Sequence, residues 1–348
     1  MAAHLAVGAD RWRYQALIGT GGIGSGAFFA LDGNHTLGRE ESRSGRFLDR
    51  RDYCKLHIIA HYVKVLLGDA FRVTPVGQVG DDAAGRQLLD EMAQAGLEMR
   101  HVRVAPASQT LFALCFVYPD GSGGNLTVSD SASSRVDPAL VAEAEPDLAA
   151  SGAEAIALAA PEVPLAARAA LLQLATRFGA LRVGAFTTGE IGPAREMGLL
   201  GLLDLVALNR DEAAMLAGLS PSQPPDAIAA DVVRAAQECR PGLRVSVTAG
   251  ADGSWVWDGQ DLHHLPAQPA PVASTAGAGD AHLAGLLAGL AAGLPLSEAH
   301  VLASLAAACS VTSPHTIHKG LDADALRALA EQRPAALPAT VRALLRLP

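Results

Sequence analysis

Short apolar runs alternate with longer helical patterns through the second half of this chain, and this alternation constrains the fold most. Runs of strand length occupy residues 155–159, 181–185, 205–208 and 244–248. Helical patterns fall between them, at residues 165–178, 211–216 and 225–238. Strands that alternate with helices build a mainly parallel sheet covered on both faces. The sequence therefore predicts an α/β fold.

The first half continues this pattern with strands at residues 16–18 and 72–76 and helices at 57–67 and 85–95. Two of its regions differ. Residues 111–117 and 125–128 flank a turn that reads Pro-Asp-Gly-Ser-Gly-Gly, which predicts an antiparallel hairpin. Residues 28–51 are polar and irregular.

Composition limits the kinds of partner and the cellular location that we expect for this protein. The chain has 348 residues, half of them hydrophobic, and a net charge of −9 without a basic run typical of nucleic-acid binding. The longest apolar stretch, residues 281–294, is too short to cross roughly 30 Å of hydrocarbon and predicts a buried helix. The start of the chain lacks a signal-peptide pattern. We expect no nucleic-acid or membrane partner and a cytoplasmic location, which also suits four widely spaced cysteines: Cys54, Cys115, Cys239 and Cys309.

A small-residue turn before the buried helix carries the strongest chemical signal. Gly277-Ala278-Gly279 leads directly into Asp280 and the apolar segment. Free N–H groups at a helix start bind phosphate, and glycine lets that backbone approach an anion closely. A carboxylate beside a phosphate is unfavourable unless it takes part in the chemistry. Asp280 is therefore a candidate base for a hydroxyl that attacks phosphorus.

Three further motifs follow strands. Residues 76–85 form a glycine turn in which Asp81 or Asp82 caps the following helix, a structural role. Asn209-Arg-Asp-Glu212 fits a helix cap with Glu at its third position, and equally a phosphate and metal contact. Residues 247–254 end a strand in the pattern Thr-x-Gly-x-x-Gly, which fits a strand-to-strand turn or a turn beneath a nucleotide.

Residues 274–281, Ser-Thr-Ala-Gly-Ala-Gly-Asp-Ala, resemble the signature Asp-Thr-x-Gly-Ala-Gly-Asp-Ala of the PfkB (ribokinase-like) carbohydrate kinase family. The other three motifs match family patterns in family order. The resemblance implies a transferase that moves the γ-phosphoryl group of ATP, with Mg²⁺, to a hydroxyl of a sugar, a nucleoside or a related small molecule. Ser274 replaces an Asp that helps bind a monovalent cation in some members, so we expect that cation site to be weak or absent.

The resemblance also implies roles for single residues. Asp280 would be the catalytic base, and Glu212 would organise Mg²⁺ through water. The remaining assignments are an anion hole at Gly277, Ala278 and Gly279, and nucleotide contacts at Asn209, Glu212, Thr248, Gly250 and Gly253. The implied architecture is a ribokinase-like three-layer sandwich, a single domain over residues 1–348. Its small β lid would come from about residues 28–50 and 108–130.

The acceptor half departs from the family pattern. The family's Gly-Gly-x-x-x-Asn is absent from the helix that begins at Cys54, and the glycine-rich residues 19–26 stand where an early Asp bonds sugar hydroxyls. We therefore expect poor activity on free ribose and fructose. Other groups would bind the acceptor, and the candidates are Asp32, Asn34, Lys55 and His57.

Two other functions stay open on the sequence. Gly19-x-Gly21-x-x-Gly24 after a strand fits a dinucleotide fingerprint, so an NAD(P)-dependent oxidoreductase is one, with Glu40 or Glu41 as its ribose contact. The polar surroundings of these acids argue against it. A non-catalytic relative that binds nucleotide or sugar is the other. A homodimer is one assembly that the sequence leaves open.

Overall fold

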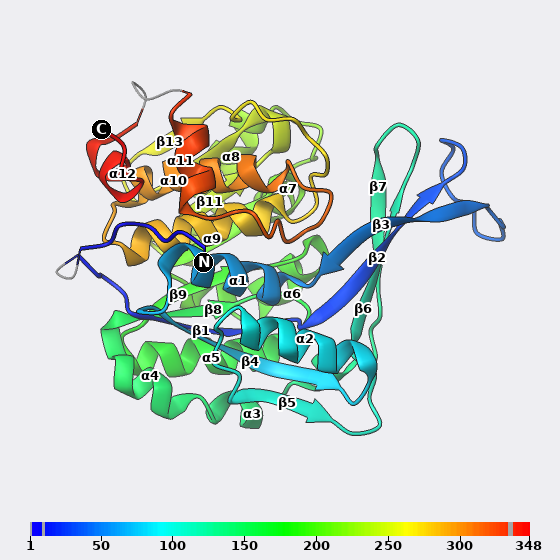
Figure 1. Ribbon diagram of the computed structural model, residues 1–348, viewed down its shortest axis with the longest axis horizontal. Helices are drawn as coiled ribbons and strands as arrows, with labels where there is room; N and C mark the ends of the chain where they lie inside the picture. Colours follow the sequence, from blue (N-terminus) through cyan, green and yellow to red (C-terminus); the bar gives the residue numbers. More distant parts are fainter. Residues whose placement is uncertain (1, 9–10, 333–336) are drawn as a thin grey trace.

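Two β-sheets of different size organise the chain. The computed structural model describes residues 2–8, 11–332 and 337–348. A nine-stranded sheet runs through the body of the molecule, and a four-stranded sheet projects from it (Figure 1). The predicted α/β class is confirmed, with helices on both faces of the large sheet.

The large sheet has the order β13-β12-β11-β10-β9-β8-β1-β4-β5. All neighbours from β11 to β5 run parallel, whereas β12 and β13 are antiparallel additions at one edge. Its strands are β1 (Ala16–Thr20), β4 (Arg72–Gly80), β5 (His101–Ala105), β8 (Ala155–Ala159), β9 (Leu181–Ala185), β10 (Leu205–Asn209), β11 (Arg244–Thr248), β12 (Ser254–Trp257) and β13 (Leu262–Leu265).

The helices form the two outer layers. One face of the sheet carries α1 (Lys55–Leu67), α2 (Ala83–Gln94), α9 (Ala278–Ala291), α10 (Leu296–Ser310), α11 (Ala323–Ala330) and α12 (Ala339–Leu344). The other carries α3 (Pro138–Ala142), α4 (Glu145–Ser151), α5 (Leu165–Phe178), α6 (Ile191–Glu196), α7 (Arg210–Ala217) and α8 (Pro225–Cys239).

The period of two along a strand explains this three-layer packing. Successive side chains of a strand point to opposite faces of its sheet. On β1, Leu17 packs into the core beneath α1 and α9, while Ala16 and Ile18 pack into the core beneath α3 and α5. Central strands such as β8 are buried on both faces, so their sequences are continuously apolar.

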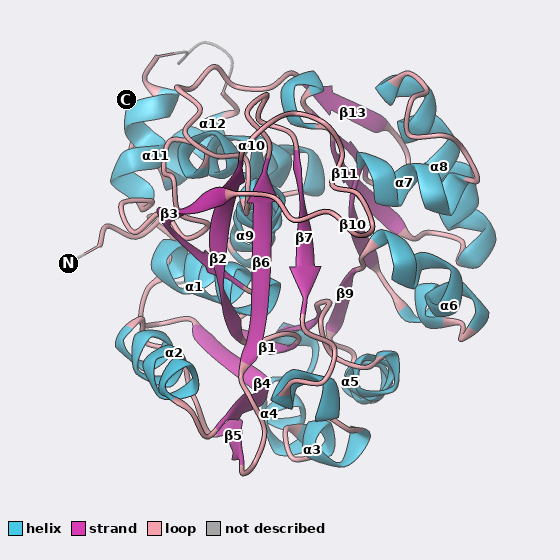
Figure 2. Cartoon of the chain, turned by 90° about the vertical axis from the view of Figure 1, so that its right-hand side faces the viewer, coloured by secondary structure: helices cyan, strands magenta, loops and turns pink. Residues whose placement is uncertain are grey.

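The projecting sheet is a lid-like layer with the order β3-β2-β6-β7. Its strands are β2 (Gly24–Leu31), β3 (Gly45–Tyr53), β6 (Leu111–Val117) and β7 (Gly123–Thr127). The predicted hairpin is confirmed as the antiparallel pair β6 and β7, which Figure 2 shows in front of the body. Strands β2 and β3 cover much of the region that the sequence showed as irregular and polar. Pairing of β2 with distant β6, and of β3 with β2, supplies the order that the local pattern lacks.

The turn after β1 contradicts the dinucleotide fingerprint. That motif requires a helix after the glycines, because the pyrophosphate binds at the N-terminus of the helix. Here Gly24 begins the lid strand β2, and Glu40 and Glu41 lie in the distal connection between β2 and β3. The residues proposed for an NAD(P) site therefore do not form one.

No helix among the residues that the structure describes has both the length and the apolar character needed to span a bilayer. The long apolar stretch predicted to be a buried helix is α9, which packs between α1 and α10.

Candidate active site

A cavity of about 570 Å³ lies at the carboxyl ends of β10 and β11. Its walls come from the starts of α7 and α9, the connection 267–272 and the second half of α10. Ligands of open α/β sheets bind beyond the carboxyl ends of the strands, as here. The cavity brings together every nucleotide and anion-hole residue that the sequence predicted: Asn209, Glu212, Thr248, Gly250, Gly253, Gly277, Ala278, Gly279 and Asp280.

The first turn of α9 offers free N–H groups to this cavity. Ala278 N–H donates to the carbonyl of Thr275 at 3.2 Å, and Ala281 N–H donates to the carbonyl of Gly277 at 2.9 Å. Within the described chain, the N–H groups of Gly279 and Asp280 have no hydrogen-bond acceptor. Within the first turn of α9, which begins at Ala278, the two free donors are therefore those of Gly279 and Asp280, with the positive end of the helix dipole behind them.

The two glycines of the turn have different tasks. Gly277 has φ +79°, and a Cβ there would lie 2.7 Å from the carbonyl oxygen of Thr316. The backbone conformation therefore requires glycine. A Cβ on Gly279 would meet nothing closer than Thr248 Oγ1, at 3.7 Å. Gly279 is thus not needed for folding, but its missing side chain keeps the approach to the helix start open.

Asp280 and Lys55 form the charged centre of the site. Asp280 is the third residue of α9, and Lys55 is the first residue of α1, which packs directly against α9 (Figure 1). The Asp280 carboxylate is the largest cause that raises the pKa of Lys55, and Glu212 raises it further. Burial raises the pKa of Asp280, and the Lys55 ammonium opposes that shift. In the described chain Lys55 has no carboxylate within ion-pair distance, so its ammonium is available to an anion.

Asn209 and Glu212 form a reciprocal cap at the start of α7. Asn209 Oδ1 accepts the Glu212 N–H at 2.9 Å, and Glu212 Oε2 accepts the Asn209 N–H at 2.8 Å. The structural role considered from sequence is therefore present, and both residues also line the cavity. Burial raises the pKa of Glu212 and the Lys55 ammonium opposes this. The cap fixes one carboxylate oxygen and leaves the second for solvent or a hydrated cation.

The turn after β11 closes the cavity from another side. Thr248 ends the strand, and the chain turns through Gly250 with φ +57° and Gly253 with φ +93° into the antiparallel β12. A Cβ on Gly253 would collide with the carbonyl of Leu265. The strand-to-strand turn and the cavity wall are thus the same feature, as the sequence allowed.

Glu162 was not singled out from sequence. It follows the carboxyl end of β8 and adopts φ +74°, a left-handed conformation uncommon for a residue with a side chain. Its Oε2 accepts the N–H of Lys55 at 3.1 Å. Burial raises the pKa of Glu162 to about 7, and the charge of Asp280 adds to this shift. The signal available in the sequence was an acid just past a buried central strand.

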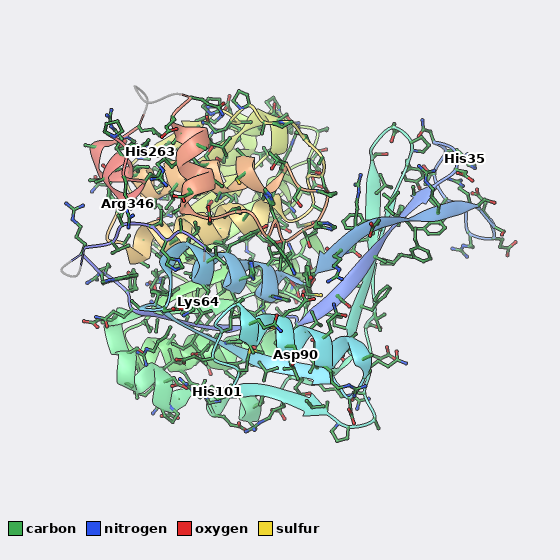
Figure 3. The ribbon with its side chains drawn as sticks, in the orientation of Figure 1. His35, Lys64, Asp90, His101, His263 and Arg346 are labelled. Carbon is green, nitrogen blue, oxygen red and sulfur yellow. The ribbon has the colours of Figure 1, made fainter. Side chains whose placement is uncertain are left out.

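Three predicted acceptor contacts do not reach the cavity. Asp32 and Asn34 are exposed and lie in the distal connection of the lid, where Figure 3 labels the neighbouring His35 at the outer tip. Asn34 Oδ1 accepts a hydrogen bond from the Asp120 N–H at 3.0 Å, and this bond joins the two distal turns of the lid. His57 is 1% exposed and packs edge-on against Tyr53 in the core. Of the four predicted contacts, Lys55 alone lines the cavity, beside the anion site.

Comparison with known proteins places this geometry in a family. The model of the pfkB family of carbohydrate kinases matches residues 59–323. A fructokinase from Klebsiella pneumoniae is 28% identical over 265 residues, which cover 70% of this chain and 80% of that protein. The sugar kinase YegV of Escherichia coli is 32% identical over 121 residues, and these cover 34% of this chain and 36% of that protein.

Solved structures agree at the level of the fold. Ribokinase from Cryptococcus neoformans in complex with ADP superposes with a TM-score of 0.73 at 21% identity, over 92% of this chain and 99% of that one. Arabidopsis thaliana ribokinase with ribose and ATP gives 0.69 at 18% identity, over 91% and 98%. The fold is ribokinase-like. The chain belongs to the pfkB family of carbohydrate kinases, and it is an ATP-dependent phosphotransferase with an alcohol group as acceptor.

Proposed function

We propose that this kinase phosphorylates a hydroxyl of a sugar, a nucleoside or a related polyhydroxy compound, with Asp280 as the base. The observation that carries the proposal is the meeting of three features at one point. These are the free N–H groups of Gly279 and Asp280, the Asp280 carboxylate and the Lys55 ammonium.

The proposed role of each residue follows from its position in the cavity. The triphosphate would lie along the cavity with its γ-phosphoryl group at the start of α9, against the two free amides. Asn209 and the turn at Thr248 and Gly250 would hold the rest of the nucleotide. Mg²⁺ would neutralise charge on the phosphates, and Glu212 would act on it through water, because Mg²⁺ keeps most of its water ligands in such sites.

The transfer itself needs one base and several positive groups. Asp280 takes the proton from the acceptor hydroxyl as that oxygen attacks the γ-phosphorus. The bond between the γ-phosphorus and the bridging oxygen breaks, ADP leaves, and the proton rests on Asp280. The Lys55 ammonium and the two amides stabilise charge on the transferred oxygens. We thus assign Lys55 to the phosphoryl group rather than to the acceptor alone.

A coupled ADP-release assay on sugars, nucleosides and sugar phosphates tests the proposal, together with thermal shift in Mg²⁺ and a non-hydrolysable ATP analogue. We expect stabilisation by the analogue and acceptor-dependent release of ADP. Free ribose and fructose should stay below a kcat/KM of about 10⁴ M⁻¹s⁻¹, the lower end of ordinary enzymes. Binding of the analogue without release of ADP for any acceptor would instead favour a non-catalytic relative.

Three predictions from the sequence stay predictions. They are a cytoplasmic location, a weak or missing monovalent-cation site at Ser274, and a homodimer. One feature supports the dimer: Phe47, Phe112 and Leu126 on the lid sheet are 68%, 42% and 58% exposed. Light scattering of the purified protein measures the assembly directly.

A further inference from the structure

We propose that Asp52, at the end of lid strand β3, is a specificity-determining residue that accepts a hydrogen bond from a second hydroxyl of the acceptor. Glu162 lies nearby, against Gly22 just before lid strand β2, and holds the start of α1 through the Lys55 N–H. This inference rests on the proposed function, because it concerns the acceptor end of the same site.

Position is the first argument. The acceptor hydroxyl must reach Asp280, so its other groups must touch whatever surrounds that carboxylate on the side away from the nucleotide. The negative charge of Asp280 acts on Asp52 and Glu162, and the pKa of each carboxyl is raised, chiefly by burial. Thr316 links the two regions. Its Oγ1 accepts the N–H of Tyr53 at 3.0 Å, and its carbonyl contacts the Gly277 turn.

A row of glycines is the second argument. Gly24 and Gly26 are two residues apart on β2 and therefore face the same side of that strand, and Gly22 lies just before it. A Cβ would meet Glu162 and Leu111 at Gly22, the carbonyl of Leu111 and the thiol of Cys54 at Gly24, and the carbonyl of Ala113 and the carboxylate of Asp52 at Gly26. The distances would be 2.7 Å to Cys54 Sγ and 2.6 Å to Asp52 Oδ2. The missing side chains thus make room for the backbone of β6 at Gly24 and Gly26, and for the Asp52 carboxylate at Gly26.

The third argument is that the Asp52 carboxylate is short of strong donors, whereas Glu162 accepts the Lys55 N–H. Asp52 is 7% exposed, and a hydrogen bond reaches its Oδ2 from the Cys115 thiol, a weak donor, at 3.4 Å. The Tyr53 N–H and the Thr316 hydroxyl also act on Asp52, but burial outweighs them. In the described chain neither Asp52 nor Glu162 forms an ion pair. Buried carboxylates are costly unless they receive hydrogen bonds, and hydroxyls of a bound acceptor supply them.

The chemistry of the acceptor follows from this arrangement. One hydroxyl faces Asp280 and is phosphorylated, and a second hydroxyl of the same molecule donates to Asp52. A site built to bond hydroxyls rejects analogues that lack them, because its polar groups are then left unpaired. The acceptor class is therefore a polyhydroxy compound rather than a simple alcohol.

Asp52→Asn tests the proposal, with Asp49→Asn as its control, because Asp49 lies on the same strand and is exposed. The probes are D-glucose, D-mannose, D-galactose, D-ribose, D-fructose, D-mannitol, myo-inositol and adenosine, with their monodeoxy analogues. For the best of these acceptors, Asp52→Asn should raise KM by about 10–10²-fold, the value of a charge-assisted hydrogen bond. The KM for ATP and the melting temperature should stay near wild type. Asp49→Asn should change none of these quantities.

A mutant cycle separates contact from general disturbance. On the wild type, one deoxy analogue should raise the acceptor KM by the same factor as Asp52→Asn does with the intact acceptor. On Asp52→Asn, that analogue should raise the KM no further. Additive losses for every analogue, or an unchanged acceptor KM, would overturn the proposal. Asp52→Ser is the second variant if the amide form does not fold.

Failure of the proposed function gives a different result. In that case the wild type releases no ADP with any probe, and Asp52 is tested by thermal shift instead. A probe that raises the melting temperature of the wild type and of Asp49→Asn, but not of Asp52→Asn, supports the contact. Equal shifts in all three proteins, or no shift by any probe, overturn it.

Discussion

The nucleotide half and the acceptor half of this site are built in different ways. The nucleotide half uses short motifs in which neighbouring residues act together, such as the cap of Asn209 and Glu212 and the turn at Gly277–Gly279. The proposed acceptor half brings together separate elements, with Asp52 on β3 and Glu162 after β8. The proposed phosphate site thus depends on local geometry, whereas the proposed acceptor site depends on tertiary packing.

Asp280 is where the halves meet, so the largest effect is expected there. Asp280→Asn should lower kcat by roughly 10²–10⁴-fold, the span of general-base catalysis. Affinity for ATP should hold or improve, because a negative charge leaves the phosphate site. Parallel measurement of kcat and of ATP-analogue affinity checks both statements. Turnover near wild type would remove Asp280 from the mechanism.

The anion site should respond next. Gly279→Val places a branched side chain at the open helix start, and loss of a preorganised donor site typically costs about 10²–10³-fold in rate. The protein should still fold, because the nearest atom to a Cβ there is 3.7 Å away. Gly277→Ala is the contrasting variant, since its φ of +79° and the Thr316 carbonyl oppose any side chain. A lowered melting temperature for Gly277→Ala alone, with lost turnover for Gly279→Val, would confirm the division of tasks.

His57 belongs to the core and should affect stability rather than acceptor binding. Burial, followed by the charge of His61, lowers the pKa of His57 to about 3. An unfolded chain binds this proton below about pH 6.5, so the contribution of His57 to stability is present above that pH and is lost toward pH 3. At pH 5 the loss is about 2 kcal/mol relative to pH 7.5.

His57→Gln should remove this pH dependence, and the difference between the two proteins cancels the other titrating groups. Urea unfolding at pH 7.5 and pH 5 measures it. The KM for the acceptor should not change. A raised acceptor KM with no altered pH dependence would return His57 to the binding site.

The smallest effect is expected at the cap of α2. Asp82 accepts hydrogen bonds from the Gly85 N–H and from the N–H and hydroxyl of Thr110, at 2.7, 2.7 and 2.6 Å. It thereby ties α2 to the chain that enters β6. Asp82→Ala should lower the free energy of unfolding by about 1 kcal/mol and leave kcat unchanged. Asp81→Ala, at an exposed residue paired with Arg86, is the control and should cost less.

The sequence predicted the parts that depend on neighbouring residues. The strands β8, β9 and β11 and the helix α5 have the predicted ends, because buried strands and amphipathic helices carry their pattern locally. The residues of the nucleotide cavity were predicted for the same reason, since each motif joins a strand end to a helix start.

Contacts between distant segments could not be predicted in this way. Strand β2 gains its order from pairing with β6, some 80 residues further along the chain, and β3 gains its order from pairing with β2. Asp32 and Asn34 were chosen because they are near the first strand in sequence, yet the lid carries them to its outer tip. Asp52 belongs to lid strand β3 and Glu162 follows β8 of the large sheet, so their placement depends on how the two sheets are joined.

Transfer of the phosphoryl group to a hydroxyl, rather than to water, is the central claim, and ³¹P NMR of the reaction in H₂¹⁸O tests it most directly. With Mg²⁺, ATP and an acceptor identified by the ADP-release assay, we predict a phosphate-ester signal that grows in equal amount with ADP and carries no ¹⁸O. Inorganic phosphate labelled with ¹⁸O, formed at the same rate with and without acceptor, would contradict the account.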